Sequence, residues 1–280
     1  MNRVGLIGWP VAHSLSPKMH NAAFEALGLS DWHYDAMAIP PDVLRYGILE
    51  PQRHGYIGIN VTIPHKQAVM EFCTPDEKAR AIGAVNTIDL RSGEGTNTDV
   101  DGFIDDLSAH AFKLDQERIL VLGAGGAARA ALYGLAQAGA DVAVHNRTAS
   151  KAEEMVRQLT KSAGLAAIPV MDISTALAWK PSLIVNCTSA GMDPDIQSLP
   201  YPEDISLPEG VDVYDMVYRP AQTLFMQKAL AGGGRAVNGL GMLARQGARA
   251  FTLWTGYEAP IEVMLQVLED ALYSSSANAE

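Results

Sequence analysis

The chain has 280 residues, of which 48% are hydrophobic, and it carries a formal net charge of −11. Its length and apolar content are enough for a sizeable core and for two globular domains. The negative charge argues against nucleic acid as a partner, because binding a phosphate backbone requires clustered Lys and Arg. Glycine and proline interrupt the N-terminal apolar stretch, and no run approaches the roughly 20 apolar residues of a membrane span. We therefore expect a cytoplasmic protein without a membrane segment.

The two cysteines lie far apart, and neither belongs to a CxxC pair. Cys73 falls in a predicted helix and Cys187 at the end of a predicted strand. We expect both to be buried free thiols in a reducing compartment. Together with the scattered histidines they form no evident zinc site, so no metal is predicted.

Strands alternate with helical patterns along the whole chain, which predicts an α/β protein with mainly parallel sheets. The first strand is expected over Arg3–Gly8. A helix follows, with Ser16 as its cap, Pro17 at its first position and Gly28 as its stop. Apolar residues recur along this helix at the spacing of one helical face: Met19, Ala22, Ala23, Ala26 and Leu27.

A second strand is predicted over Tyr56–Ile63, where apolar and small or polar residues alternate. Pro64 ends this strand and opens a helix. A third extended stretch is expected over Ala84–Leu90, and a fourth over Thr96–Asp99.

The middle of the chain carries a stronger signature. A strand over Arg118–Leu122 runs into Gly123-Ala-Gly-Gly-Ala-Ala128, and a helix and a strand over Asp141–His145 follow. A GxGxxA turn between a strand and a helix is the fingerprint of a dinucleotide-binding Rossmann fold. The turn residues predicted to contact the cofactor are Gly123, Ala124, Gly125, Gly126 and Ala127.

Three further features complete the chain. Strands are predicted over Leu183–Cys187 and Val211–Met216, and Gly232–Gly234 is interpreted as an ordinary turn. The chain is expected to be helical from Gly239 onward, with Ser274–Glu280 as a frayed tail.

The end of the second Rossmann strand indicates which dinucleotide binds. NAD enzymes usually place an acidic residue there for the ribose hydroxyl, whereas NADP enzymes must neutralise a phosphate. Here the strand ends in Asn146-Arg147-Thr148, without an acid. Arg147 can pair with the phosphate while its two neighbours donate hydrogen bonds, so NADP is predicted. The alternative is that Arg147 is an ordinary surface residue.

A hydride transfer to a ketone requires a group that supplies a proton to the resulting alkoxide. No Tyr is followed four residues later by Lys, so the Tyr-x-x-x-Lys device of short-chain dehydrogenases is absent. Asn60 and Thr62 share a face at the carboxyl end of their strand, where ligands bind in open parallel sheets. Lys66 is expected in the first turn of the next helix, where a cation is unfavourable, and is therefore a functional candidate.

Asp99, at the end of the fourth extended stretch, is the predicted partner of Lys66. Asp101 competes for that role, but it precedes a helical pattern and is better explained as a cap. A metal site built with Asp105 and Asp106 is a third interpretation, although both fit an exposed helix face.

The chain resembles the shikimate dehydrogenase (shikimate/quinate dehydrogenase) family over nearly its whole length. The resemblance is carried by eight ordered motifs: Gly8-Trp-Pro-Val-Ala-His-Ser-Leu-Ser-Pro-Lys-Met-His-Asn21, Gly58-Ile-Asn-Val-Thr-Ile-Pro-His-Lys66, Ile82-Gly-Ala-Val-Asn-Thr87, Asn97-Thr-Asp99, Gly123 to Ala128, Asn146-Arg-Thr148, Asn186-Cys-Thr-Ser-Ala-Gly-Met192 and Gly239-Leu-Gly-Met-Leu-Ala-Arg-Gln246. One departure is Asn238-Gly239, where the family often has Asp-Gly.

The resemblance implies roles for individual residues. Lys66 and Asp99 would be the catalytic pair, and Thr188 and Gly239 would join the cofactor-binding set. The implied substrate-binding residues are Ser14, Ser16, Asn60, Thr62, Asn86, Tyr218 and Gln246. Structural explanations stay open for three of these: a helix cap for Ser16, a loop tie for Asn86 and a buried amide for Gln246.

The resemblance also implies an architecture and an activity. Residues 1–101 would form a substrate-binding and catalytic domain, residues 102–238 a Rossmann domain for NADP, and residues 239–280 helices that return to the first domain, with the active site in the cleft. The implied reaction is the NADP-dependent, reversible reduction of 3-dehydroshikimate to shikimate by a monomer or homodimer. A quinate or dual-specificity dehydrogenase and a non-catalytic sensor remain alternatives.

Overall fold

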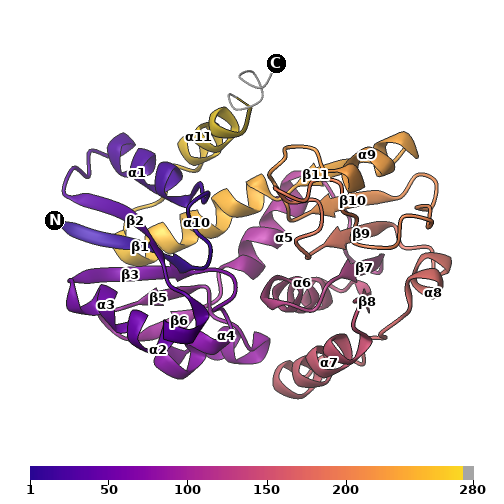
Figure 1. Cartoon of the computed structure of the whole chain (residues 1–280), viewed down its shortest axis with the longest axis horizontal. Coiled ribbons are helices and arrows are strands. Elements are labelled where there is room, and N and C mark those ends of the chain that lie inside the picture. Colours follow the sequence, from indigo (N-terminus) through magenta and orange to yellow (C-terminus); the bar gives the residue numbers. More distant parts are fainter. Residues whose placement is uncertain (274–280) are drawn as a thin grey trace. The chain divides into compact units, whose positions relative to one another are not determined.

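The computed structural model describes residues 1–273 (Figure 1). The chain forms two compact units. Unit 1 combines Met1–Gly102 with the chain from Leu243 onward, and unit 2 is Phe103–Met242. Two helices cross the divisions, α5 (Asp99–Ala109) and α10 (Leu240–Thr255). Within the described residues, no helix has the length and apolar run that crossing a bilayer requires.

Unit 1 is built on a sheet of six strands among the described residues. These strands are β1 (Asn2–Gly8), β2 (Trp32–Ala38), β3 (Tyr56–Val61), β4 (Thr74–Pro75), β5 (Thr87–Asp89) and β6 (Glu94–Thr96). Their order is β2-β1-β3-β5-β6-β4. β1 pairs in parallel with β2 and β3, whereas β5 runs antiparallel to β3 and β6. β4 also pairs in parallel with β6, so the sheet is mixed and β5 is its antiparallel strand.

Helices cover both faces of this sheet. They are α1 (Ser16–Ala26), the 3-10 helix η1 (Pro41–Val43), α2 (Leu44–Gly47), α3 (Leu49–Arg53), the 3-10 helix η2 (Ala68–Phe72), α4 (Glu77–Ile82), α10 and α11 (Ile261–Tyr273). α1 packs on α11 and β2. In Figure 1, α1 and α11 lie on one side of the strands and α2 and α3 on the other.

The two faces of the unit 1 sheet have different cores. On the side of α2 and α3 the core is aliphatic, with Ile7, Ile59 and Val61 of the sheet at its centre. On the side of α1 and α10 it is aromatic. The stacked or tilted rings there are those of His20, Phe24, Tyr34, Phe251 and Trp254. Gly58 is required on this face, because a Cβ would lie 2.0 Å from Nε1 of Trp254.

The predicted apolar stripe of α1 is partly wrong. Met19 and Ala23 are buried as expected, but Leu27 is 40% exposed. The buried face instead includes His20 and Phe24, whose rings extend the aromatic core. A search for aliphatic residues at helical spacing misses His20, because this histidine is buried by the stacking of its ring on other aromatic rings. The predicted stop is correct, since α1 ends before Gly28, which has a φ of +68°.

The predicted strand over Tyr56–Ile63 is too long. β3 ends at Val61, and a turn closed by the His65 N–H on the Thr62 carbonyl follows. Ile63 lies in this turn and is 63% exposed, so it does not continue the buried face.

Unit 2 has a five-stranded parallel sheet in the order β11-β10-β9-β7-β8, with helices on both faces. Its strands are β7 (Arg118–Leu122), β8 (Asp141–His145), β9 (Leu183–Asn186), β10 (Asp212–Asp215) and β11 (Ala236–Asn238). Its other helices are α6 (Gly126–Gln137), α7 (Ala149–Ala163), α8 (Ile173–Ala178) and α9 (Leu224–Ala231). One apolar core lies under α5, α6 and α7, and a second lies under α8 and α9. This doubly wound arrangement confirms the predicted Rossmann-like fold.

Three smaller expectations concern the cysteines, the Gly232–Gly234 turn and the C-terminal tail. Both cysteines are free thiols, but each is half-buried, and Cys73 follows η2 rather than lying inside a helix. The turn at Gly232–Gly234 is confirmed, since Gly232 ends α9 and Gly233 has a φ of +82°. The predicted tail, Ser274–Glu280, lies outside the described residues.

Candidate active site

A buried ion pair lies at the centre of the candidate site in unit 1. The Lys66 Nζ donates to Oδ2 of Asp99 at 2.7 Å. The two side chains are only 15% and 5% exposed. Such a pair in a dry environment is costly unless it is well hydrogen-bonded, so its presence is typical of a functional site.

The loop that carries Lys66 is held in place by backbone and side-chain contacts. Lys66 lies in a turn before η2, so its predicted position in a helix is wrong. The Lys66 carbonyl accepts from the Val85 N–H at 2.7 Å, a contact to another segment. Next to it, the buried His65 ring contacts the Ile39 carbonyl at 2.7 Å. The helix-dipole argument for Lys66 therefore fails, and its candidacy depends on the pairing with Asp99.

Asp99 is the first residue of α5 and does not end a strand, which corrects its predicted position. Its N–H donates to the Asn97 Oδ1 at 3.1 Å, and a carboxylate at a helix N-terminus is favoured by the helix dipole. Asp101 lies inside the helix, where it pairs with Lys78, so it is not the predicted cap.

The predicted exposure of the next acidic residues is wrong for Asp106. Its side chain is 2% exposed, and its Oδ2 accepts from the Tyr214 hydroxyl at 2.7 Å. Within residues 1–273, no cluster of three or more His, Cys, Asp or Glu is arranged as a metal site.

Asn86 connects the ion pair to two other predicted residues. Its Nδ2 donates to the Asp99 Oδ1 at 2.9 Å and to the Gln246 Oε1 at 3.3 Å. Its Oδ1 accepts from the Thr98 N–H at 2.8 Å, which fixes the orientation of the amide. Asn86 therefore ties down a loop and orients Asp99 at the same time. Gln246 also donates to the Leu243 carbonyl at 2.9 Å, so both ends of its amide are used.

Asn60 joins the same network from β3. Its Nδ2 donates to the Thr87 Oγ1 at 3.0 Å, and Thr87 donates to the Asn86 Oδ1 at 3.0 Å. Thr62 lies just beyond the end of β3 and is half-buried. Thr87 and Thr98 are site residues that were not singled out from the sequence, although both stand inside quoted motifs beside a predicted residue.

Ser14 and Ser16 lie together at the start of α1. The Ser14 Oγ donates to the Ser16 Oγ at 3.2 Å and accepts from the Ser16 N–H at 3.3 Å. Ser16 is the first helical residue, and Leu15 occupies the cap position, so the prediction that Ser16 caps the helix is wrong. The Ser16 hydroxyl makes no capping bond, and its contact with Ser14 places the two hydroxyls side by side.

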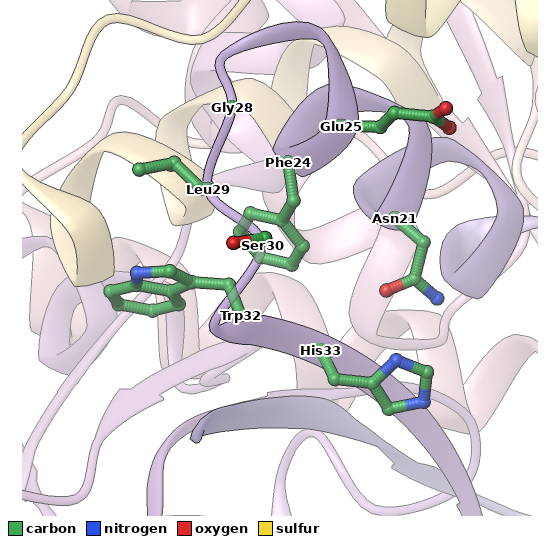
Figure 2. Close-up of a pocket in the computed structure, with 8 residues that line it drawn as sticks. All are labelled: Asn21, Phe24, Glu25, Gly28, Leu29, Ser30, Trp32 and His33. Carbon is green, nitrogen blue, oxygen red and sulfur yellow. The ribbon is translucent and has the colours of Figure 1, made fainter.

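A pocket of about 390 Å³ lies at the opposite end of α1, where the chain turns into β2 (Figure 2). Phe24, Leu29 and Trp32 form much of its wall. None of the predicted site residues lines it, so it is distinct from the network around Asp99.

The glycine loop of unit 2 has the geometry that phosphate binding requires. Gly123 has a φ of +119°, which disfavours any side chain. Gly125 is the N-cap of α6, and a Cβ there would meet nothing within 4 Å. The first turn of α6 contains no acidic residue. Its N–H groups are therefore suited to an anion.

The turn after β8 has a similar character. Thr148 occupies the N-cap of α7 without a capping hydrogen bond, and the first turn of that helix has no acidic residue. The Asn146 Nδ2 donates to the Thr148 carbonyl at 2.8 Å, while Arg147 is exposed. These residues offer a cation next to a second uncapped helix N-terminus.

The remaining cofactor candidates, Thr188 and Gly239, follow β9 and β11 at the carboxyl-terminal edge of the parallel sheet. A Cβ on Gly123 would lie 3.2 Å from the Thr188 methyl group, so these two residues are neighbours. Thr188 is held by its N–H and hydroxyl, which both donate to the Asn186 Oδ1. Gly239 approaches the Met216 backbone, where a Cβ would lie 2.4 Å from the carbonyl oxygen.

A buried carboxylate supports this edge. The Asp215 Oδ1 accepts from Asn186 at 2.9 Å, and its Oδ2 accepts from Thr223 at 2.6 Å. Burial raises the pKa of Asp215 to about 6, and its hydrogen bonds oppose that rise. Asp215 was not singled out from the sequence. Tyr218, the last predicted substrate residue, follows on the same segment of unit 2, and burial raises the pKa of its hydroxyl.

Three family models match the chain. The model described as "Shikimate dehydrogenase substrate binding domain" matches residues 6–88. The model described as "Shikimate / quinate 5-dehydrogenase" matches residues 106–193, and "Shikimate 5'-dehydrogenase C-terminal domain" matches residues 239–269.

Individual relatives match nearly the whole length of the chain. Shikimate dehydrogenase (NADP(+)) from Methanocella arvoryzae is 40% identical over 272 residues, which is 97% of this chain and all of that protein. The structure of shikimate 5-dehydrogenase from Thermus thermophilus in complex with NADP(H) and shikimate has a TM-score of 0.86 and 37% identity, over 97% of this chain and 100% of that chain. The structure of quinate dehydrogenase from Corynebacterium glutamicum in complex with NAD has a TM-score of 0.84 and 28% identity, over 96% of this chain and 99% of that chain. On its identity to these full-length relatives, the chain belongs to the shikimate dehydrogenase family.

Proposed function

We propose that this protein catalyses the NADP-dependent, reversible reduction of 3-dehydroshikimate to shikimate, a step of aromatic amino acid biosynthesis. The observation that carries the proposal is the buried 2.7 Å pair between Lys66 and Asp99, with Asn86 bonded to the second carboxylate oxygen. The NADP-dependent relatives that match nearly the whole chain support the same reaction.

The pair has the chemistry that the reaction needs. NADPH supplies the hydride when it is bound, and the carbonyl oxygen of the substrate then requires a proton. Lys66 carries three N–H donors, and Asp99 takes one of them in a fixed direction. The other two can reach a substrate oxygen and deliver a proton as the alkoxide forms. Asp99, held by Asn86, positions the lysine for this transfer.

The substrate is a polyhydroxy carboxylic acid, which suits the remaining polar groups. We assign the carboxylate to the hydroxyls of Ser14 and Ser16 at the start of α1, where the helix N-terminus also favours an anion. We assign the ring hydroxyls to the amide and hydroxyl groups of Asn60, Thr62, Asn86, Tyr218 and Gln246.

Unit 2 fits NADP. Uncapped N-termini of α6 and α7, without acidic residues in their first turns, suit the pyrophosphate and the 2′-phosphate. Gly123 to Ala127 would cradle the pyrophosphate, while Asn146, Arg147 and Thr148 would hold the 2′-phosphate. Thr188 and Gly239 would complete the site. Residues 102–238 would thus form the cofactor domain, and residues 1–101 with 239–280 the catalytic one.

Quinate dehydrogenase is the second candidate, favoured by the match to the shikimate/quinate model and to a quinate dehydrogenase structure. The acid-free turn at Arg147 argues against its NAD preference. A non-catalytic sensor is disfavoured because the Lys66–Asp99 pair is intact. A spectrophotometric assay of shikimate and quinate, each with NADP⁺ and NAD⁺, tests all three. We expect turnover to be fastest with shikimate and NADP⁺, and no turnover with any pair would refute an enzymatic function.

We further propose that the enzyme acts in the cytoplasm on small molecules, without nucleic acid, as a monomer or homodimer. The net charge of −11 supports the exclusion of nucleic acid. Light scattering coupled to size-exclusion chromatography would give the number of chains directly.

A further inference from the structure

Tyr34 on β2 lies beneath the candidate substrate site and has not been assigned a role. Its side chain is 1% exposed, and its hydroxyl donates to the Asn60 Oδ1 at 2.8 Å. Burial raises the pKa of this hydroxyl, and a hydrogen bond with the Ser16 hydroxyl acts in the opposite direction. Tyr34 therefore touches two residues that we assign to the substrate, and these come from different elements.

Tyr34 is followed by a run of hydrogen bonds in which each residue donates to the next. Tyr34 donates to Asn60, Asn60 donates to Thr87, and Thr87 donates to Asn86. Asn86 in turn donates to the carboxylate of Asp99. A buried phenol thus stands in a run of hydrogen bonds that reaches the carboxylate of the catalytic pair, while the Asn86 amide next to that carboxylate is also fixed by Thr98.

The chain determines what Asn60 can offer to a ligand. An amide has two N–H donors and two acceptor positions on its oxygen. Both donors of Asn60 are used, by the Asn86 carbonyl at 3.3 Å and the Thr87 hydroxyl at 3.0 Å. Tyr34 occupies one acceptor position. Asn60 is left with a single acceptor position on Oδ1, which matches a hydroxyl group that donates.

The ring of Tyr34 is itself held rigidly. The His20 ring stacks on it with centroids 4.3 Å apart and planes within 3°. Both His20 nitrogens are buried and have no hydrogen-bond partner among the described residues, so His20 contributes its flat surface only. Removing the Tyr34 hydroxyl would leave this stacking unchanged.

We propose that Tyr34 is a positioning residue that fixes the Asn60 amide as a hydrogen-bond acceptor and thereby selects for a donating hydroxyl on the substrate. This inference rests on the proposed function. Without the Tyr34 hydroxyl, the Asn60 amide loses one of the three hydrogen bonds that orient it, the one made by its oxygen.

The test compares Tyr34→Phe with Tyr56→Phe. Tyr56 is the matched control, because its hydroxyl also donates to a polar side chain of unit 1, Asp35 at 2.7 Å, but outside the network. Calorimetry would measure shikimate binding in the presence of NADPH, which cannot oxidise it. Two shikimate analogues, each lacking one of the two non-reacting hydroxyls, would be titrated alongside. Thermal unfolding would show that both variants are folded.

We expect Tyr34→Phe to raise the Kd and KM for shikimate about tenfold, the scale of one hydrogen bond, with kcat and the KM for NADP⁺ nearly unchanged. One analogue should bind the wild type more weakly than shikimate does, and this difference should shrink in Tyr34→Phe. Tyr56→Phe should behave as the wild type in both respects.

The outcomes separate the inference from the function. The positioning role is refuted if Tyr34→Phe binds shikimate with the Kd of the wild type. It is also refuted if each analogue loses the same affinity, relative to shikimate, in Tyr34→Phe as in the wild type. If the wild type binds shikimate but does not oxidise it with NADP⁺, the proposed reaction fails while the binding comparison still decides the role of Tyr34. A wild type that does not bind shikimate refutes both.

Discussion

Lys66 and Asp99 come from separate segments of unit 1 and meet at 2.7 Å. Because the Asp99 carboxylate also accepts from Asn86, its two oxygens are engaged from two directions. This arrangement orients the lysine while leaving two of its N–H groups for a substrate.

Replacing Lys66 with Ala should lower kcat at least about a hundredfold, the scale of general acid–base catalysis, with a modest change in KM. The reason is that the variant lacks the group that gives a proton in the reduction and takes one in the oxidation, but keeps the groups assigned to substrate binding. Steady-state kinetics with shikimate and NADP⁺ would measure this. Lys78→Ala, which removes the lysine of the Lys78–Asp101 pair, is the control and should keep its kcat. Near-normal kcat in Lys66→Ala, with weaker binding alone, would make Lys66 a binding residue.

His20 makes the stability of unit 1 sensitive to acid. Burial without a polar partner lowers its pKa from 6.5 to about 3. Below pH 6.5 the unfolded chain therefore binds a proton that the folded chain refuses, and stability falls as the pH falls toward 3. The expected slope is about 1.4 kcal/mol per pH unit.

Replacing His20 with Phe should remove this contribution while keeping the stack on Tyr34. Urea unfolding at a series of pH values between 7 and 4 would compare the variant with the wild type, and the difference in stability should grow in favour of the variant as the pH falls. His54→Phe, at an exposed position, should keep the wild-type slope. Parallel pH dependences of the wild type and His20→Phe would contradict the explanation.

At the scale of elements, the start of α1 offers two hydroxyls with different surroundings. Replacing Ser14 or Ser16 with Ala should raise the KM for shikimate more than it lowers kcat, because both are assigned to a carboxylate that binds equally in the ground and transition states. Ser16→Ala should not lose the stability that a helix cap contributes, since Ser16 does not cap the helix. Kinetics and thermal unfolding together check this. A penalty confined to kcat would count against the assignment.

The turn after β8 determines the cofactor preference. The wild type should favour NADP⁺ over NAD⁺ in kcat/KM, because Arg147 faces no acidic neighbour in the turn and Lys151 follows nearby. Arg147→Ala should remove roughly 1.5 to 3 kcal/mol of NADP⁺ binding, the value of a hydrogen bond to a charged group. NAD⁺ binding should be nearly unchanged. Equal weakening of both cofactors would mean that Arg147 shapes the adenosine pocket instead.

The elements also show how far sequence patterns reach. β7 and β8 were predicted to the residue, because buried parallel strands appear as continuous apolar runs between a glycine turn and a helix. β2 was not predicted. Its half-buried edge position allows His33 and Asp35 among its aromatic residues, which obscures the pattern.

The candidate site was less accessible to sequence reasoning than the fold. Motifs named Lys66, Asp99 and Asn86, and the structure brings these three together. The predicted helical position of Lys66 was wrong. Lys66 lies in a turn, and its carbonyl accepts a hydrogen bond from Val85, a residue of another segment. Tyr34 carried no signal, since its role arises from contacts between β2, β3 and α1 that no local spacing encodes.

At the scale of the whole molecule, the chain passes between the two units at two positions. Both divisions of the chain fall inside helices, α5 and α10, so each of these helices contributes residues to both units. The domain boundaries at residues 101 and 238, which the family resemblance implies, stay predictions, and motif positions carry no information on where a continuous helix passes from one unit to the other.

Unit 1 is also interrupted in sequence, and this has a consequence for its synthesis. The aromatic face formed by His20, Phe24 and Tyr34 is covered by Phe251 and Trp254, which follow the whole of unit 2. On the ribosome, the first 102 residues must therefore emerge and wait, with this face uncovered, while some 140 further residues are translated, which at typical rates takes on the order of ten seconds. The segment made first completes its folding last, and until then its apolar rings stay exposed, which favours aggregation.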